Sequence, residues 1–158
     1  MTSDTAASVA LVDKDAAELA TWLPTTMALY VQARMDAGDT ADQARTAAEE
    51  SQAAYFPDGV PADGHRIFTI TADGDDAGWL WIGPFKPGAD WWIWDIEVHE
   101  PFRRRGIGEA AMRLAEDVAR TAGSASLGLN VFGGNETARR LYERVGYAVT
   151  AVHMRKTL

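Results

Sequence analysis

The residues best suited to chemistry form a short basic, glycine-containing run, Arg103-Arg104-Arg105-Gly106-Ile107-Gly108-Glu109, which follows an apolar, β-prone stretch. A segment with helical periodicity begins at the glycines, so the run is expected to open a helix. The first N–H groups of a helix have no partner within it, and the helix dipole makes that end partly positive. Glycine lets a bulky anion approach the backbone closely. The run therefore predicts a site for a phosphate-bearing ligand.

Composition narrows the possible ligands. The chain has 158 residues, a formal net charge of −8 and no cysteine, and it is most simply one domain over 1–158. Without cysteine there are no disulfides, thiolate metal sites or cysteine nucleophiles, and no metal site is expected. The acidic charge argues against nucleic acid, which needs a broad basic face, and favours cationic, amine-bearing substrates.

The basic residues of the last third nevertheless cluster around the run, which predicts a local anion pocket on an acidic protein. No stretch approaches the roughly 20 apolar residues of a membrane span. The segment Met1 to Ala10 lacks the basic start and long apolar run of a signal peptide. We therefore expect a cytoplasmic protein with no membrane partner.

The first half of the chain is expected to supply strands and two helical regions. A weak alternation over 8–12 predicts a short strand, and Thr40 is a candidate N-cap for a helix over 40–54. The helical pattern from Lys14 to Gly38 is interrupted at Leu23-Pro24, because the residue before proline disfavours helix; alternatively Pro24 begins a helix at its first position. Alternating segments then predict strands over 66–71, 78–82 and 91–98.

The second half is expected to continue with helices over 107–122 and 136–145 and strands over 126–132 and 147–154. The resulting order, β-α-α-β-β-β-α-β-α-β, indicates an α/β (α+β) sandwich with a β-α-β unit at the basic run.

Together the motifs of this half resemble those of a known family. Arg103-x-x-Gly106-x-Gly108 is followed by Asn135-x-x-Ala138-x-x-x-Tyr142 and by Gly146-Tyr147. This series resembles the GNAT superfamily of N-acetyltransferases, which use acetyl-CoA, and in detail a small bacterial single-domain subgroup. The resemblance covers about 91–158, and the first half agrees in element order. It implies the GNAT fold, a mixed sheet of six to seven strands flanked by about four helices.

The resemblance also implies how acetyl-CoA is held. The backbone N–H groups from about Arg105 to Glu109 would bind the pyrophosphate, with added positive charge from the arginines. The backbone of the strand before the run would hold the pantetheine, and an N–H near Val98 would meet the thioester oxygen. The expected cofactor contacts are Ile96, Glu97, Val98, Arg103, Arg104, Arg105, Gly106, Ile107, Gly108, Glu109, Asn130, Asn135, Ala138 and Tyr142.

The leaving CoA thiolate needs a proton, and Tyr142 lies where the family places its general acid. It follows Asn135 by seven residues, two turns along one helical face. The alternative is that Tyr142 is a buried helix aromatic that packs near Leu141 and Val145. Asn135 is a candidate N-cap, a cofactor contact or both.

The substrate ammonium must lose a proton before attack, and the superfamily has no fixed residue for this step. Glu97 is the first candidate base, with Asp95, because strand alternation puts both opposite Ile96 and Val98. Burial raises a carboxylate's pKa, which suits a base. The alternatives are two solvated carboxylates, a water chain, or the weaker candidates His99 and His153.

The acceptor site is expected in the least matched part of the chain. Tyr30, the second helix, the 55–65 loop, Asn130 and the tryptophans could line it. Such a site would receive an amine on a hydrophobic stem. The tryptophans could instead build core. The set of tryptophans is Trp79, Trp81, Trp91, Trp92 and Trp94.

We therefore predict an acetyl-CoA-dependent N-acetyltransferase that transfers acetyl directly to a primary amine in a ternary complex. No cysteine is present to carry a covalent acetyl group, which supports direct attack. A small-molecule amine is the expected acceptor, and a protein N-terminus or lysine is the alternative. From another class, the fold could serve as a non-catalytic acyl-CoA sensor or partner module. A homodimer is possible.

Overall fold

A five-stranded mixed sheet forms the middle layer of the computed structural model, which describes residues 7–158. The first residues of the Met1–Ala10 segment thus lie outside the described part. Strands β1 to β4 form an antiparallel series and β5 pairs parallel to β4. The strands are β1 (Val9–Asp13), β2 (Arg66–Ala72), β3 (Asp75–Pro84), β4 (Trp91–Val98) and β5 (Leu127–Leu129).

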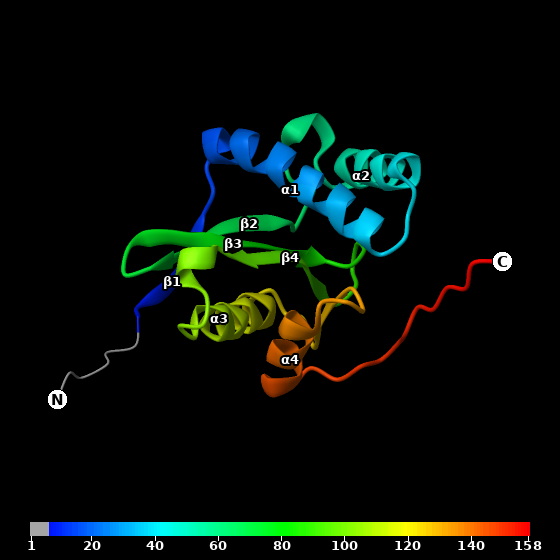
Figure 1. Cartoon of the computed structure of the whole chain (residues 1–158). Coiled ribbons are helices and arrows are strands. Elements are labelled where there is room, and N and C mark those ends of the chain that lie inside the picture. The colour runs from blue at the N-terminus through cyan, green and yellow to red at the C-terminus, as the bar shows by residue number, and fades with distance from the viewer. Residues whose placement is uncertain (1–6) are drawn as a thin grey trace.

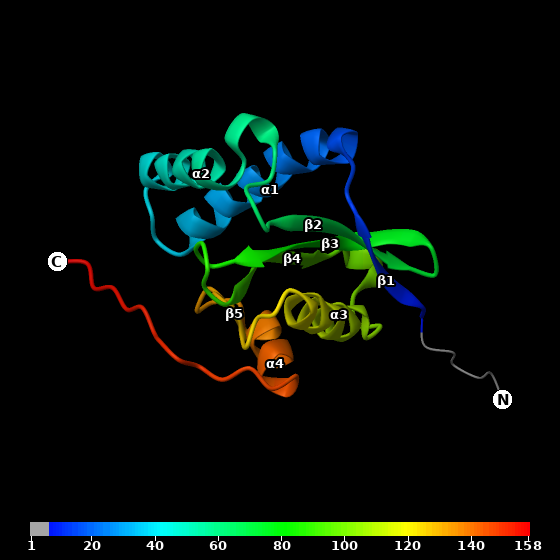
Figure 2. The same ribbon diagram turned by 180° about the vertical axis from the view of Figure 1, so that it is seen from behind.

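Helices cover both faces of this sheet (Figures 1 and 2). Helices α1 and α2 lie on one face, and α3 and α4 lie on the other. Short 3-10 turns, η1 and η2, follow α2 and β4. The helical bounds are α1 (Ala16–Asp36), α2 (Ala41–Tyr55), η1 (Pro57–Gly59), η2 (Glu100–Phe102), α3 (Ile107–Thr121) and α4 (Glu136–Arg144). The α/β class expected from the sequence is confirmed.

Each face of the sheet has its own apolar core. Between the sheet and α3, Ile70, Leu80 and Met112 are fully buried. Between the sheet and α1–α2, the core is aromatic, with Trp22 and Trp81 at its centre. Because side chains alternate along a strand, one β-strand contributes to both cores.

The expected break at Leu23-Pro24 is wrong, since α1 continues through Pro24 as one helix of 21 residues. A proline inside a helix costs roughly 3 kcal/mol, because it removes one hydrogen bond and crowds the preceding turn. Trp22, Leu23 and Met27 surround Pro24 and are buried against the sheet. This tertiary packing offsets the local cost of the proline. A rule based on neighbouring residues alone contains no information about that packing.

The expected count of six to seven strands is also too high, because five are formed in the described residues. The strand expected over 126–132 contracts to the three residues of β5, and the strand expected over 147–154 does not form. That last segment leads away from the body, with Val149, Val152 and Met154 exposed. A strand needs a partner, and β5 ends too early to provide one.

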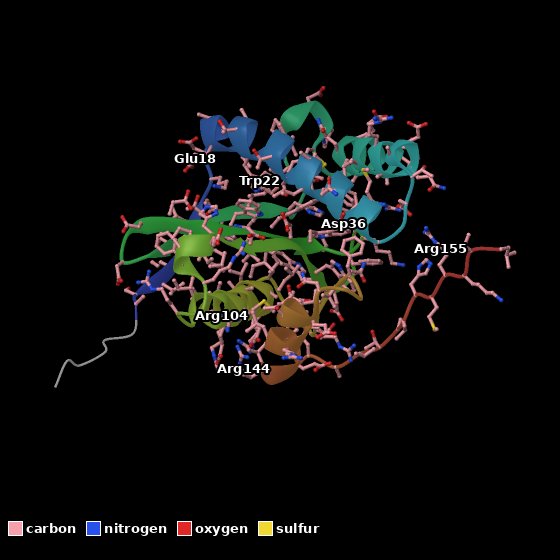
Figure 3. All side chains as sticks on the ribbon, viewed as in Figure 1. Glu18, Trp22, Asp36, Arg104, Arg144 and Arg155 are labelled. Atoms are coloured by element: carbon pink, nitrogen blue, oxygen red, sulfur yellow. The ribbon has the colours of Figure 1, made fainter. Side chains whose placement is uncertain are left out.

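The C-terminal segment does make one defined contact with the body. Arg155 donates hydrogen bonds to the Gly38 carbonyl oxygen (3.2 Å) and to Asp39 Oδ1 (3.0 Å). Arg34 binds the same carboxylate at 2.6 Å, and its bond is the largest cause of the lowered pKa of Asp39. Figure 3 shows Arg155 on the segment that passes the end of α1.

Candidate active site

The N-terminal end of α3 has free backbone donors. Its N-cap is Gly106, whose φ of +76° lies in the left-handed region that favours glycine, and no side chain caps this end. The Gly106 carbonyl accepts its bond from Ala110, so the N–H groups of residues 107–109 precede the first intrahelical donor. These groups lie where the basic run predicts an anion-binding site.

The three arginines of the run lie in different environments. Arg103 binds residues that precede it in the chain. Its Nε lies 2.8 Å from the Val98 carbonyl oxygen, and its Nη2 lies 2.6 Å from Glu97 Oε1. The Arg105 guanidinium lies 5.6 Å from the centre of the Phe102 ring. Arg104 is exposed and has no ion pair with another described residue (Figure 3). Arg104 and Arg105 thus keep donors for an anion, whereas Arg103 fixes the end of β4.

A carboxylate stands in the first turn of α3, and two arginines neutralise it. Glu109 binds Arg113 at 2.8 Å and Arg144 of α4 at 3.4 Å. The hydrogen bond from Arg113 is the largest cause of the lowered pKa of Glu109. Arg144, the last residue of α4, thereby ties the end of that helix to the first turn of α3.

Beside this helix end, β4 has an unpaired edge. Its parallel pairing with β5 covers only Trp91 to Ile93. On the other edge, the register with β3 shifts so that Trp94 becomes an extra, bulged residue. Residues 94–98 therefore have no strand partner on the β5 side. Apart from the Val98 carbonyl, which Arg103 binds, the backbone groups that point to that edge are available to an extended ligand.

The same segment separates apolar from acidic side chains. Ile96 and Val98 pack on the α3 side, in the core around Met112. Asp95 and Glu97 stand opposite Trp81 and Trp79 of β3, on the face covered by α1. The alternation expected from the sequence is thus present, although the bulge places Trp94 and Asp95 side by side on one face.

Asp95 is partly buried beside the aromatic core and is held by two hydrogen bonds. Its Oδ2 accepts hydrogen bonds from the Thr26 hydroxyl (2.5 Å) and from Trp79 Nε1 (2.7 Å). Desolvation by burial raises the pKa of Asp95 and outweighs these two bonds, which favour the ionised form. Glu97 is half-buried and paired with Arg103. Of the two candidate bases, Asp95 has the environment that suits proton abstraction.

Tyr142 stands on the opposite face of the sheet. It packs against the α3-side core, and its hydroxyl forms no hydrogen bond with another described residue. Burial is the main cause that raises its pKa to about 12, and the charges of Asp95 and Glu97 add to the effect. The phenol is therefore protonated at neutral pH and lies within electrostatic range of both carboxylates.

Asn135 caps α4, since its Oδ1 accepts a hydrogen bond from the Ala138 N–H at 3.2 Å. The N-cap role weighed for it is therefore present. Asn130 follows β5 directly and is exposed. The structure thus brings the basic run, β4 and α4 together, while Asn130 makes no side-chain contact with them in the hydrogen-bond network of residues 7–158.

The tryptophans divide between core and surface. Trp79 and Trp81 are buried, so the core alternative holds for them. Trp92 and Trp94 are only partly buried, and Trp94 has an indole N–H that is buried without a partner.

Two features of the site could not be read from the sequence. Thr26 lies in the middle of a helix, where nothing in its neighbourhood distinguishes it from other helical threonines. The bulge at Trp94 depends on pairing with β3. The only local signal for either was Asp95 itself, a carboxylate within an aromatic strand.

In the described part of the chain, no group of three or more His, Asp or Glu side chains could hold a metal ion. None of the helices over residues 7–158 is long and apolar enough to cross a membrane.

Known proteins share this architecture. The crystal structure of YycN, an acetyltransferase from Bacillus subtilis, superimposes with a TM-score of 0.85 at 30% identity, over 96% of this chain and 99% of that one. The uncharacterized N-acetyltransferase YdgE of Bacillus subtilis (strain 168) is 38% identical over 120 residues, 72% of this chain and 76% of that protein. Streptothricin acetyltransferase of Streptomyces lavendulae is 37% identical over 91 residues, 58% of this chain and 48% of that protein.

The fold is therefore that of an acetyltransferase. The model of the acetyltransferase (GNAT) family matches residues 28–147. The chain belongs to this family and is an N-acetyltransferase, as the motifs of its second half indicated.

Proposed function

We propose that the protein transfers acetyl from acetyl-CoA directly to a primary amine within a ternary complex. One observation carries the proposal: the unpaired edge of β4, residues 94–98, opens beside the uncapped N-terminus of α3. A chain of amides such as pantetheine can bind a free strand edge, and a pyrophosphate fits a helix N-terminus. The residues present thus suit acetyl-CoA, with Arg104 and Arg105 as exposed counter-charges.

The acid and the base would act from opposite faces of the sheet. Asp95, on the α1 face, would take the proton of the attacking ammonium. Tyr142, on the α3 face, would give its phenolic proton to the thiolate sulfur as the carbon–sulfur bond breaks. The new carbon–nitrogen bond would form between them, in the gap where β4 has no partner. This division keeps the two proton transfers apart.

A small-molecule amine is the acceptor that we propose. The acidic protein, with its net charge of −8, favours a cationic substrate, and aromatic side chains line the α1 face of β4. A relative that matches part of the chain is named for acetylating the small molecule streptothricin. A protein N-terminus or lysine is the alternative acceptor, and a non-catalytic acyl-CoA sensor is the alternative from another class.

The test is thiol release from acetyl-CoA across a panel of small primary amines, with peptides that carry a free N-terminus or a lysine as a second panel. Acceptor-dependent release with the amines supports the proposal, and release only with peptides favours the protein acceptor. Tight acetyl-CoA binding by calorimetry without release in either panel would establish the sensor. The homodimer and the cytoplasmic location stay predictions, and analytical ultracentrifugation checks the first.

A further inference from the structure

A pocket of about 490 Å³ lies between the end of α2 with its following loop and the loop that joins β3 to β4. Tyr55 and Phe85 contribute aromatic rings to its lining, and four prolines stiffen its walls. Asp63, Lys86 and His65 are its polar members. The pocket is therefore a half-open, mainly apolar hollow with a few polar groups, a lining that suits a small molecule.

His65 offers this pocket a hydrogen-bond donor of fixed position. Trp81 Nε1 donates to His65 Nδ1 at 3.0 Å, so the neutral ring must carry its proton on Nε2. Desolvation lowers the pKa of His65, which keeps the ring neutral at pH 7. Among residues 7–158, no side chain or carbonyl accepts a hydrogen bond from Nε2. A ligand that brings an acceptor oxygen or nitrogen would satisfy it.

The close fit behind His65 indicates that this orientation is built into the fold. A Cβ on Gly83 would lie 2.8 Å from His65 Nδ1 and 3.0 Å from its Cα. Only glycine leaves room there for the imidazole to reach Trp81.

A stack of aromatic rings lies between the pocket and Asp95, the proposed base. Phe85 and Trp94 stack at 5.9 Å with an interplanar angle of 9°, and Trp94 stacks on Trp81 at 5.6 Å. Tyr55 lies 4.4 Å from Trp94, between ring centres. Trp94 is the bulged residue immediately before Asp95, so two rings of the pocket lining, Tyr55 and Phe85, touch the neighbour of the proposed base.

The strand gives the length of this connection. Pro84, at the pocket, pairs with Trp91, four residues before Asp95. Because Trp94 is bulged, the unbulged strand gives the better length: Pro84 lies three residues from Trp81, the partner of Asp95, and at about 3.3 Å per strand residue the pocket lies about 10 Å from the base. The nucleotide of acetyl-CoA is expected at the other end of β4, beyond Val98, so this pocket is on the acceptor side.

We propose that the pocket binds the distal end of the acceptor, and that the acceptor is an elongated primary amine with a flat, uncharged ring that carries a hydrogen-bond acceptor. The ring stacks on Phe85 and Tyr55, its oxygen or nitrogen accepts from His65 Nε2, and the ammonium reaches Asp95. This inference rests on the proposed function, because it names the substrate class for the same site.

The kinetic test compares hydroxyphenyl-terminated alkylamines of increasing chain length with plain alkylamines of the same length. We expect kcat/KM to be roughly tenfold higher or more for the ring-bearing amine whose length matches the span. In Phe85→Ala, this preference should fall towards one. Leu29→Ala, which truncates an exposed side chain of α1, is the matched control and should keep it. Equal rates for the two series, or an equal preference in Phe85→Ala, would overturn the proposal.

A binding test separates this inference from the proposed function. p-Cresol, which has the ring and hydroxyl but no amine, should quench tryptophan fluorescence saturably, and Phe85→Ala should abolish the effect. His65→Ala should weaken binding, and His65→Gln, which keeps an N–H donor, should restore part of it. Saturable quenching without any amine turnover would reject the proposed function alone. No quenching of the wild-type protein would reject the pocket.

Discussion

The hydroxyl of Thr26 donates a hydrogen bond to Oδ2 of Asp95 across 2.5 Å, which joins the middle of α1 to the bulged part of β4. Thr26 is itself buried, with 4% of its surface exposed. The bond holds the carboxylate in one orientation and favours its charged form, against the effect of desolvation. The buried face of α1 thus influences the protonation of the carboxylate proposed as the base.

Thr26→Val tests this relationship, because valine keeps the shape and removes the donor. A hydrogen bond to a charged group contributes about 1.5–3 kcal/mol, so kcat/KM at neutral pH should fall by roughly tenfold or more. The pKa of Asp95 should rise further, which moves the acidic limb of the pH–rate profile to higher pH. Thr26→Ser should restore both values. A profile for Thr26→Val that coincides with the wild type would show that Asp95 is not the base.

Tyr142→Phe removes the proposed acid without removing the ring. Turnover should fall by about a hundredfold, while the affinity for acetyl-CoA should stay within about twofold of the wild type. Since the pKa of Tyr142 is about 12, the phenol stays protonated up to about pH 10, and any fall in rate below that pH has another origin. Single-turnover kinetics and calorimetry measure the two quantities. Unchanged turnover would leave Tyr142 as a packing residue only.

Gly108→Glu places a carboxylate at the first turn of α3, where the pyrophosphate is expected. Like-charge repulsion should raise the dissociation constant of acetyl-CoA by roughly tenfold or more. A Cβ at this position would lie 3.2 Å from Leu141 Cδ2, which belongs to a flexible side chain that can give way. Ala122→Glu, at the other end of the helix, adds the same charge and should bind normally. Equal affinities for the two variants would reject this phosphate site.

Asp95→Asn separates stability from catalysis. The raised pKa of Asp95 means that the folded protein holds this proton at pH values where the unfolded chain has lost it. The free energy of unfolding therefore falls as pH rises from about 3.9, the unfolded value, through the folded value. Asparagine cannot ionise. The Tm of the variant, measured relative to that of the wild type, should therefore increase as the pH rises from 3.5 to 7.

The same variant should lose most of its turnover, whereas Glu97→Gln, the matched control, should keep the acidic limb of the pH–rate profile. Thermal unfolding in buffers of equal ionic strength gives the Tm of Asp95→Asn and of the wild type. A Tm difference that does not change with pH would mean that Asp95 is ionised without penalty.

The part of the site that is local in sequence could be predicted, and the part that depends on pairing could not. Gly106 and Gly108 mark the start of α3 in the sequence itself, because the backbone freedom of a glycine does not depend on distant segments. Tyr142 follows from helical spacing. The bulge at Trp94 and the bond from Thr26 arise between segments far apart in the chain, so no window of sequence contains them. The helix break expected at Pro24 is wrong for the same reason, because the packing that stabilises the helix there is tertiary.

The short pairing between β4 and β5 has a consequence for the energetics of the whole fold. Residues 94–98 of β4 have no strand partner on the β5 side, so the ladder on that edge is incomplete. A ligand that supplies those hydrogen bonds would act as a missing strand, and it would raise the free energy of unfolding by an amount that grows with its concentration relative to its dissociation constant. In this enzyme, substrate recognition and the completion of the fold would then be one event.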